Sequence, residues 1–352
     1  MFNLVVGNHS LVLMTLVAGD VAVYKASVGI TTNMKVDSTK WIAKSADSLG
    51  VHSIWIGEDI GIGQEVFSLT ASCLLHSSRV RVGTGIVPMS VHNISTIARA
   101  ALSLQEIANG RFVLGTGIGG LQDLHKLGID LTKPVTVLRD TVSTLRKLWA
   151  GETVNTHNQL FELDNYNMRN TGEVQIPIFL GVRGPQMLRL SGQIADGVIL
   201  SGPPDYLRDA VDEINKAARK VGRTPDMIEK VAWLPTIPTF KGGKEKLAKK
   251  VVSIVVADMP TAVIDMLSID SEKINRLREA VARGGPNAGI PFVDNEMMDT
   301  FTISGDCNHM VNMFERIVQL GVTEVVLGPP FSGDWRGAMT DIFEEITSRR
   351  DK

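Results

Sequence analysis

The sequence predicts an α/β barrel of the TIM (β/α)8 type with insertions, and three observations support this. Short apolar stretches alternate with helical stretches along most of the chain, which is typical of parallel strands joined by helices. The alternation gives eight candidate strands in 352 residues, enough for one large barrel domain. Apolar residues make up 44% of the chain and can fill a large core. An open doubly wound sheet is the alternative, because the same alternation builds both folds.

The first half of the barrel comes from four strand–helix pairs. Each apolar run is short enough for a strand, and each helical run carries apolar residues on one face. The helix after the first strand begins at Asp37 or Ser38, because either side chain can accept a hydrogen bond from a free helix amide. The expected strands are 27–32, 53–57, 79–87 and 112–115, and the expected helices are 37–49, 64–76, 94–108 and 135–149.

The second half contains the other four strands, expected at 176–180, 197–201, 231–238 and 324–328. Two connections, 116–175 and 241–300, are too long for plain loops. The second has a helical pattern and several methionines, so we expect a helical insertion over the barrel mouth. Residues 27–352 then form a single domain. Residues 1–26 form an N-terminal extension without an assigned role; it lacks the basic start of a signal peptide and an apolar run of membrane-spanning length.

Charge and cysteine usage narrow the class of function. The net charge is −2, which argues against a nucleic-acid partner, and no like-charged tail is present. Cys73 and Cys307 are far apart and form no CxxC motif, and the seven histidines show no metal-binding spacing. We therefore expect a cytoplasmic protein without a disulfide, a metal site or a membrane partner.

A pair of carboxylates follows the second predicted strand. The site of a TIM barrel lies at the carboxyl ends of its strands, so Glu58 and Asp59 fall at the barrel mouth, as does Thr31 after the first strand. A carboxyl group in a closed apolar mouth can keep a raised pKa and act as an acid. Adjacent carboxylates on a loop are more commonly solvated, and both interpretations remain open.

Residues 176–201 contain the most informative motif, with an apolar strand, a Gly181-Val182-Arg183-Gly184 turn and a helix that opens at Pro185. Glycines let a ligand approach the backbone, and the free amides at a helix start attract an anion. Arg183 adds forked donors that suit phosphate. The motif predicts a phosphate site, with Ser201 and Gly202 at the end of the next strand as further binding residues. An ordinary strand–helix turn with a surface arginine is the alternative.

Two other glycine motifs follow strands. Residues 115–120 satisfy G-x-G-x-x-G, but no helix opens directly from them and no acidic residue ends a following strand, so a glycine-rich barrel loop is favoured over a dinucleotide fingerprint. Gly85, Ile86 and Val87 end the third strand, where glycine permits a bulge or the close approach of a flat ring. An ordinary strand exit into the turn at Pro88 explains that segment equally well.

The chain resembles the luciferase-like superfamily of flavin- and deazaflavin-dependent TIM barrels from about residue 27 to its end. Within that superfamily it is most similar to the archaeal methylenetetrahydromethanopterin reductases that use coenzyme F-420. The stretches that carry the resemblance are LTKPVTVLRDTVSTLRKLWAGE at 131–152, IPIFLGVRGPQMLRLSGQIADGVILS at 176–201, MMDTFTISGD at 297–306 and LGVTEVVLGPP at 320–330, with the general superfamily pattern LSLQEIANGRFVLGTGIG at 102–119.

The resemblance implies an oxidoreductase that transfers a hydride to or from C5 of the 8-hydroxy-5-deazaflavin coenzyme F-420. Its nominal reaction reduces 5,10-methylenetetrahydromethanopterin, a pterin-type substrate, to the 5-methyl form. The turn at residues 181–184 then holds the coenzyme phosphate. Gly85, Ile86 and Val87 back the ring, with a non-proline cis peptide at Gly85–Ile86. A homodimer or homotetramer is also implied.

The sequence departs from the family at the positions that face the substrate. Thr31 replaces the family's glutamate, which is the expected acid. Glu58-Asp59 replaces Asp-His, residues 87–90 replace Thr-Asn-Pro-Tyr, and His92 replaces an arginine. We therefore expect Glu58, or else Asp59, to be the acid and Thr31 to hydrogen-bond the substrate or ring. An FMN-dependent monooxygenase and a coenzyme-binding paralogue without catalysis remain as alternative functions.

Overall fold

The structure is a computed structural model that describes residues 24–350, apart from 61–62, 121–123, 126, 169–173, 260–263 and 265–268. Most of the predicted N-terminal extension lies outside the described residues. No helix in the described part of the chain is long and apolar enough to cross a membrane.

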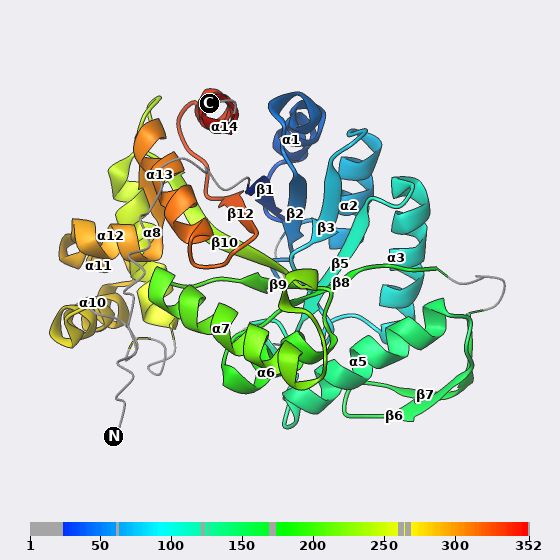
Figure 1. The fold of residues 1–352 in the computed structure, drawn as a ribbon. Helices are drawn as coiled ribbons and strands as arrows, with labels where there is room; N and C mark the ends of the chain where they lie inside the picture. The colour runs from blue at the N-terminus through cyan, green and yellow to red at the C-terminus, as the bar shows by residue number, and fades with distance from the viewer. Residues whose placement is uncertain are drawn as a thin grey trace, which may run out of the picture.

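Eight parallel strands close into a barrel, which confirms the TIM prediction over the open doubly wound sheet (Figure 1). Strand β10 closes the ring by pairing with β9 on one side and β12 on the other. The barrel strands, in order around the ring, are β1 (Lys25–Thr31), β2 (Ser53–Gly57), β3 (Arg81–Thr84), β5 (Phe112–Gly117), β8 (Ile178–Gly181), β9 (Gly197–Leu200), β10 (Glu229–Pro238) and β12 (Glu324–Gly328).

Helices join successive barrel strands and cover the outside of the ring (Figure 1). They are α1 (Val36–Leu49), α2 (Val66–Leu75), α3 (Ile94–Ala108), α5 (Pro134–Trp149), α6 (Pro185–Ile194), α7 (Pro204–Lys220), α13 (Cys307–Val318) and α14 (Trp335–Arg350), with a short η1 turn at Pro225–Met227. The predicted cap of the first helix is wrong. α1 begins at Val36, and the residue at its N-cap is Lys35, whose backbone is extended. Asp37 lies inside the first turn, where its charge interacts favourably with the helix dipole.

The third predicted strand is interrupted. β3 ends at Thr84, and a second short strand, β4 (Val87–Pro88), pairs with β5 further along. A cis peptide bond at Gly85–Ile86 separates the two strands, as the family resemblance predicted. β5 is longer than predicted and continues from Gly115 to Gly117, so Gly117 belongs to the strand rather than to a loop.

The two long connections contain elements that the sequence analysis did not resolve. The first carries an antiparallel hairpin of β6 (Val154–His157) and β7 (Glu162–Tyr166) beside α5. The second is largely helical, and its helices pack together at one side of the barrel, at the left of Figure 1. Its elements are α8 (Glu245–Asp258), α10 (Ser271–Gly284), α11 (Pro286–Gly289), η2 (Ile290–Phe292), α12 (Asn295–Phe301) and β11 (Ile303–Gly305).

The inside of the barrel is a packed core. Trp55 and Phe179 are almost fully buried there, with ring centroids 5.3 Å apart. The other buried members of this cluster are Val113, Ile199, Val231 and Val326. Because side chains fill the interior, a ligand must bind above it, at the ends of the strands.

Candidate active site

A tryptophan that the sequence analysis missed covers the top of the interior core. Trp233 on β10 is half-buried and packs against the core cluster. Glycines on the neighbouring strands make room for its indole: a Cβ at Gly29 would lie 2.4 Å from the ring, and one at Gly328 only 2.3 Å from its Nε1. Glycines on the inner face of strands were the available signal for a large side chain opposite them.

The bulge after β3 packs against two glycine-bearing strands. A Cβ at Gly117 would lie 2.8 Å from Ile86 Cδ1, and one at Gly181 would lie 2.5 Å from Ile86 Cγ2. The carbonyl of Ile86 accepts a hydrogen bond from the Glu58 amide at 3.3 Å. The structure therefore brings Ile86 next to Gly181 and Glu58, three positions that the sequence analysis selected. Val87 differs, because its side chain is fully buried in the core.

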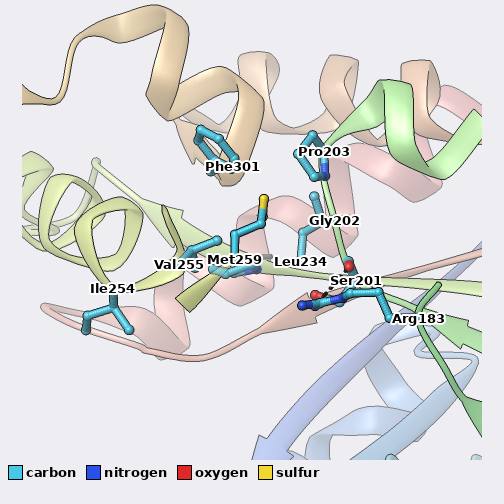
Figure 2. A pocket seen from close by; sticks show the side chains of 10 residues that line it. Arg183, Ser201, Gly202, Pro203, Leu234, Ile254, Val255, Met259 and Phe301 are labelled. Carbon is cyan, nitrogen blue, oxygen red and sulfur yellow. Dashed lines mark hydrogen bonds between the residues drawn. The ribbon is translucent and has the colours of Figure 1, made fainter. Parts of the chain in front are cut away.

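The Arg183 turn borders a cavity of about 220 Å³. Arg183 Nη2 donates to the carbonyl of Ser201 at 3.2 Å, and Gly202 follows on the same wall (Figure 2). The opposite wall is apolar and includes Val255, Met259 and Phe301. Three predicted binding residues thus meet at one cavity. Its other wall comes from the helices between β10 and β11, in the segment where the sequence predicted a helical insertion.

A buried hydroxyl lies beside the start of α6. Tyr206 on α7 is 4% exposed, and its hydroxyl has no hydrogen-bond partner in the described structure. Burial raises the pKa of Tyr206, while the charge of Arg183 and the Gly184 amide act to lower it. Gly184 has φ 84° and ψ 152°, a conformation that is essentially restricted to glycine.

The predicted carboxylate pair separates into two environments. Glu58 accepts a hydrogen bond from His92 Nε2 at 2.9 Å, and the two side chains are only 11% and 17% exposed. Asp59 lies toward β1, where its amide donates to the Thr32 hydroxyl. Thr31 donates to Asn33 Oδ1 at 2.9 Å. The sequence placed Glu58 at the mouth but did not predict its pairing with His92.

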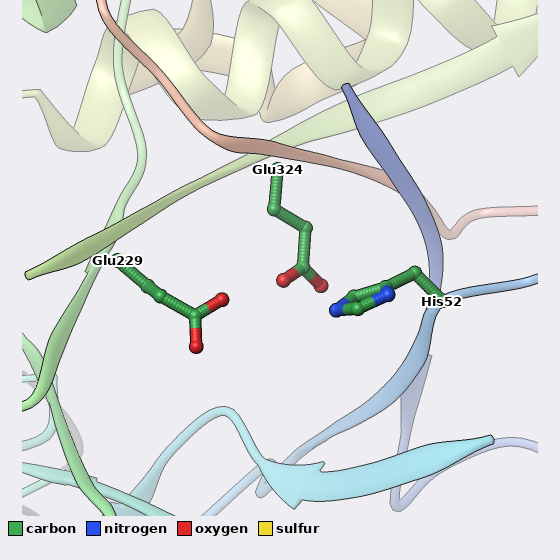
Figure 3. Close-up of side chains that lie close together, drawn as sticks. All are labelled: His52, Glu229 and Glu324. Atoms are coloured by element: carbon green, nitrogen blue, oxygen red, sulfur yellow. The ribbon is translucent and has the colours of Figure 1, made fainter. Parts of the chain in front are cut away.

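A second group of charges lies at the opposite end of the barrel, where the strands begin. His52, Glu229 and Glu324 have ligand atoms within 4.8 Å of one another, close enough in principle to hold a metal ion (Figure 3). Cations of the chain already neutralise this group: Arg81 pairs with Glu229 and Glu324, both at 2.7 Å, and Lys25 pairs with Glu229 at 2.6 Å. The group is therefore an ion-pair network of the chain itself.

The structure has the architecture of α/β-barrel enzymes that bind their ligand at the carboxyl ends of the strands. Its interior is packed, and its mouth carries a cis-peptide bulge and an arginine turn. Residues 14–324 match the model of the luciferase-like monooxygenase family. The chain therefore belongs to the luciferase-like family, which confirms the resemblance found in the sequence.

Curated relatives and solved structures agree with this placement. The chain is 30% identical to the 5,10-methylenetetrahydromethanopterin reductase of Methanolobus tindarius over 86% of this chain and 94% of that protein. It is 27% identical to the reductase of the same name from Archaeoglobus fulgidus over 92% of this chain and 98% of that protein. The structure of a coenzyme F-420-dependent tetrahydromethanopterin reductase from Methanopyrus kandleri superposes with a TM-score of 0.84 at 24% identity, covering 93% of this chain and 99% of that one.

Proposed function

We propose that this protein is a coenzyme F-420-dependent oxidoreductase that transfers a hydride between C5 of the deazaflavin and a carbon substrate. Its nominal reaction reduces 5,10-methylenetetrahydromethanopterin to the 5-methyl form. The observation that carries the proposal is the similarity to reductases of that name over almost the whole chain, at 27–30% identity. The pterin class of substrate rests on the same relatives.

The residues at the Arg183 turn fit a phosphate-bearing coenzyme. The α6 amides and the Arg183 guanidinium offer donors to an anion, and the Tyr206 hydroxyl supplies a buried hydrogen-bonding group that no described residue uses. The cavity beside the turn continues past Ser201 and Gly202, so it can receive the chain that extends from a phosphate. Gly181, Val182 and Gly184 complete this proposed phosphate site.

The bulge provides a surface for a flat ring. Gly85 and Ile86 form this surface, which we call the ledge, and the Ile86 side chain packs against Gly117 and Gly181. The Glu58 amide donates a hydrogen bond to the Ile86 carbonyl. When bound, the deazaflavin supplies the carbon that gives or accepts the hydride. The chain positions the two reactants, and Glu58, Asp59 and Thr31 are the residues we propose to act on the substrate side.

FMN is the alternative cofactor, because the family is described as monooxygenases and a phosphate turn serves either molecule. The direct test is a fluorescence titration of the purified protein with the reduced deazaflavin and separately with FMN. Addition of methylenetetrahydromethanopterin to the deazaflavin complex should then oxidise the coenzyme. Binding of FMN alone would overturn the cofactor assignment. Deazaflavin binding without turnover on the pterin would favour another substrate or the non-catalytic paralogue.

Arg183→Ala tests the proposed phosphate site. Hydrogen bonds to charged groups contribute about 1.5–3 kcal/mol, so we expect the dissociation constant of the deazaflavin to rise roughly 10- to 100-fold. Arg189→Ala is the matched control, since Arg189 lies on α6, the helix that follows the turn, and pairs with Glu213 at 2.8 Å on the exposed side. Equal affinities of the two variants would contradict the assignment of Arg183.

A further inference from the structure

Glu58 and His92 form a hydrogen-bonded pair at the barrel mouth, away from the Arg183 cavity. Glu58 directly follows β2, and the cavity is lined from β8, β9 and β10. Because β2 and β9 are four strands apart in the eight-stranded ring, the pair and the cavity lie across the mouth from each other. The Glu58 amide donates a hydrogen bond to the Ile86 carbonyl of the Gly85–Ile86 ledge. A ligand that binds Arg183 and places its ring on this ledge would therefore extend toward the pair.

The surroundings of His92 favour its charged form. Two carboxylates face the ring, Glu58 from the end of β2 and Glu65 from the start of α2. The Phe67 ring of α2 contacts the imidazole edge-on, with ring centroids 5.4 Å apart. The hydrogen bond to Glu58 raises the pKa of His92, burial acts to lower it, and the charges of Glu58 and Glu65 raise it further. The net pKa is above the ordinary value of 6.5.

Among the described residues, only Nε2 of the His92 ring has a hydrogen-bond partner. Nε2 bonds both oxygens of Glu58, each at 2.9 Å, and no described residue hydrogen-bonds to Nδ1. With Nε2–H held by the carboxylate, the imidazolium can release the proton on Nδ1 and remain a neutral, oriented ring. The arrangement has the parts of a proton donor and the group that positions it.

We propose that His92 is the proton donor of the reduction and that Glu58 is the residue that positions it; this rests on the function proposed above. Hydride reduction of a carbon–nitrogen bond requires a proton for the nitrogen. The Nδ1–H bond of His92 breaks and an N–H bond forms on the substrate, the carbon–nitrogen electron pair moves to that nitrogen, and the carbon accepts the hydride supplied by the reduced deazaflavin. Water or the proton released as the coenzyme is oxidised restores the imidazolium.

The experiment compares the full-length wild type with His92→Gln and Glu58→Gln. The chain supplies a matched control, His157→Gln, because His157 also faces a glutamate, Glu162, at 3.7 Å, but on the β6–β7 hairpin with 76% of its side chain exposed. The first measurement is an NMR titration of the histidine rings without coenzyme, and the second is deazaflavin affinity by fluorescence. The third is the pH profile of coenzyme oxidation with methylenetetrahydromethanopterin.

We expect His92 to titrate above the ordinary value of 6.5 in the wild type and at a lower pH in Glu58→Gln than in the wild type. His92→Gln should bind the coenzyme normally but turn over about 10²- to 10⁴-fold more slowly, the usual contribution of a general acid, and should lose the alkaline limb of the profile. Glu58→Gln should shift that limb to lower pH. His157→Gln should match the wild type.

Two results would overturn the proposal. The first is a His92 pKa that is no higher in the wild type than in Glu58→Gln. The second is a His92→Gln variant with wild-type turnover, and if Glu58→Gln is then inactive, Glu58 itself is the acid. If the wild-type protein binds the coenzyme but does not oxidise it when the pterin is added, the proposed substrate is refuted. The NMR titration would still decide whether Glu58 raises the pKa of His92.

Discussion

At the scale of single residues, the barrel mouth depends on positions where a side chain would collide with its neighbour. Gly117 and Gly181 leave the space that Ile86 fills, and Gly29 leaves the space for Trp233. The Arg183 turn was predicted from a short local motif, whereas the cis peptide at Gly85–Ile86 was predicted from the family resemblance. The pairing of Glu58 with His92 could not be read in this way, because it depends on how two loops 34 residues apart meet in space.

Gly184→Ala separates backbone strain from ligand binding. A Cβ at Gly184 meets open space, but φ 84° with ψ 152° is a conformation that other residues rarely adopt. We expect the substitution to lower the free energy of unfolding by about 1–3 kcal/mol and to weaken deazaflavin binding, because the turn must change shape. Gly222→Ala is the control, since Gly222 has φ 76° and equally open space after α7. It should lose stability and keep its affinity, and a parallel loss of affinity in both variants would contradict the role of the turn.

At the scale of elements, the prediction succeeded for strands and helices whose apolar residues recur with a clear period. The barrel strands and the helices between them have buried faces, and most of their bounds fall within a few residues of those expected. The β6–β7 hairpin was missed because its residues are mostly exposed and carry no apolar run. β11 was missed because it has only three residues, and its partner β10 lies more than 60 residues earlier in the sequence.

Helix α2 begins with a capping carboxylate, which makes its stability depend on pH. Burial acts to raise the pKa of Glu65, but hydrogen bonds from the amides of Phe67 and Ser68 outweigh burial and hold the pKa below the ordinary 4.5. A lowered pKa means that this stabilisation is complete above the unfolded-state value and is lost as pH falls through the folded-state value. Glu65→Gln should therefore lower the free energy of unfolding by about 1 kcal/mol at neutral pH and by less below pH 4.5.

Chemical unfolding at several pH values measures this effect. Asp270→Asn, at the corresponding cap of α10 where Asp270 accepts from the Glu272 amide, serves as the control for loss of a capping charge. Because Glu65 also faces His92, Glu65→Gln should lower the pKa of His92 as well, whereas the α10 variant should leave it unchanged. An unchanged His92 titration in Glu65→Gln would show that the start of α2 does not influence the proton donor.

At the scale of the whole molecule, one ion-pair network ties together the starts of five barrel strands. Glu324 of β12 is fully buried and accepts hydrogen bonds from Ser27 of β1 and Trp55 of β2, both at 2.6 Å. Arg81 of β3 joins Glu324 to Glu229 of β10. These residues come from strands far apart in the sequence, so neither composition nor periodicity could predict the network. It closes the end of the barrel opposite the candidate site.

Arg81→Met should destabilise the entire barrel rather than one element. The substitution keeps the apolar length of the side chain over Trp55 and Phe179 but leaves Glu324 without its guanidinium. Removing one partner of a buried ion pair typically costs about 3–5 kcal/mol. Lys25→Met removes a more exposed partner, with 38% of its side chain accessible, so it should cost under about 1 kcal/mol. Equilibrium unfolding in denaturant compares the two variants.

The double variant Arg81→Met/Glu324→Gln tests whether charge is the cause. Replacing the carboxylate removes the uncompensated buried charge, so the double variant should recover part of the stability lost in Arg81→Met. Deazaflavin affinity should stay near the wild-type value in every variant that remains folded, because the network and the Arg183 turn lie at opposite ends of the strands. If Arg81→Met cost no more than Lys25→Met, the network would be dispensable and closure of the barrel would depend on strand pairing and the apolar interior alone.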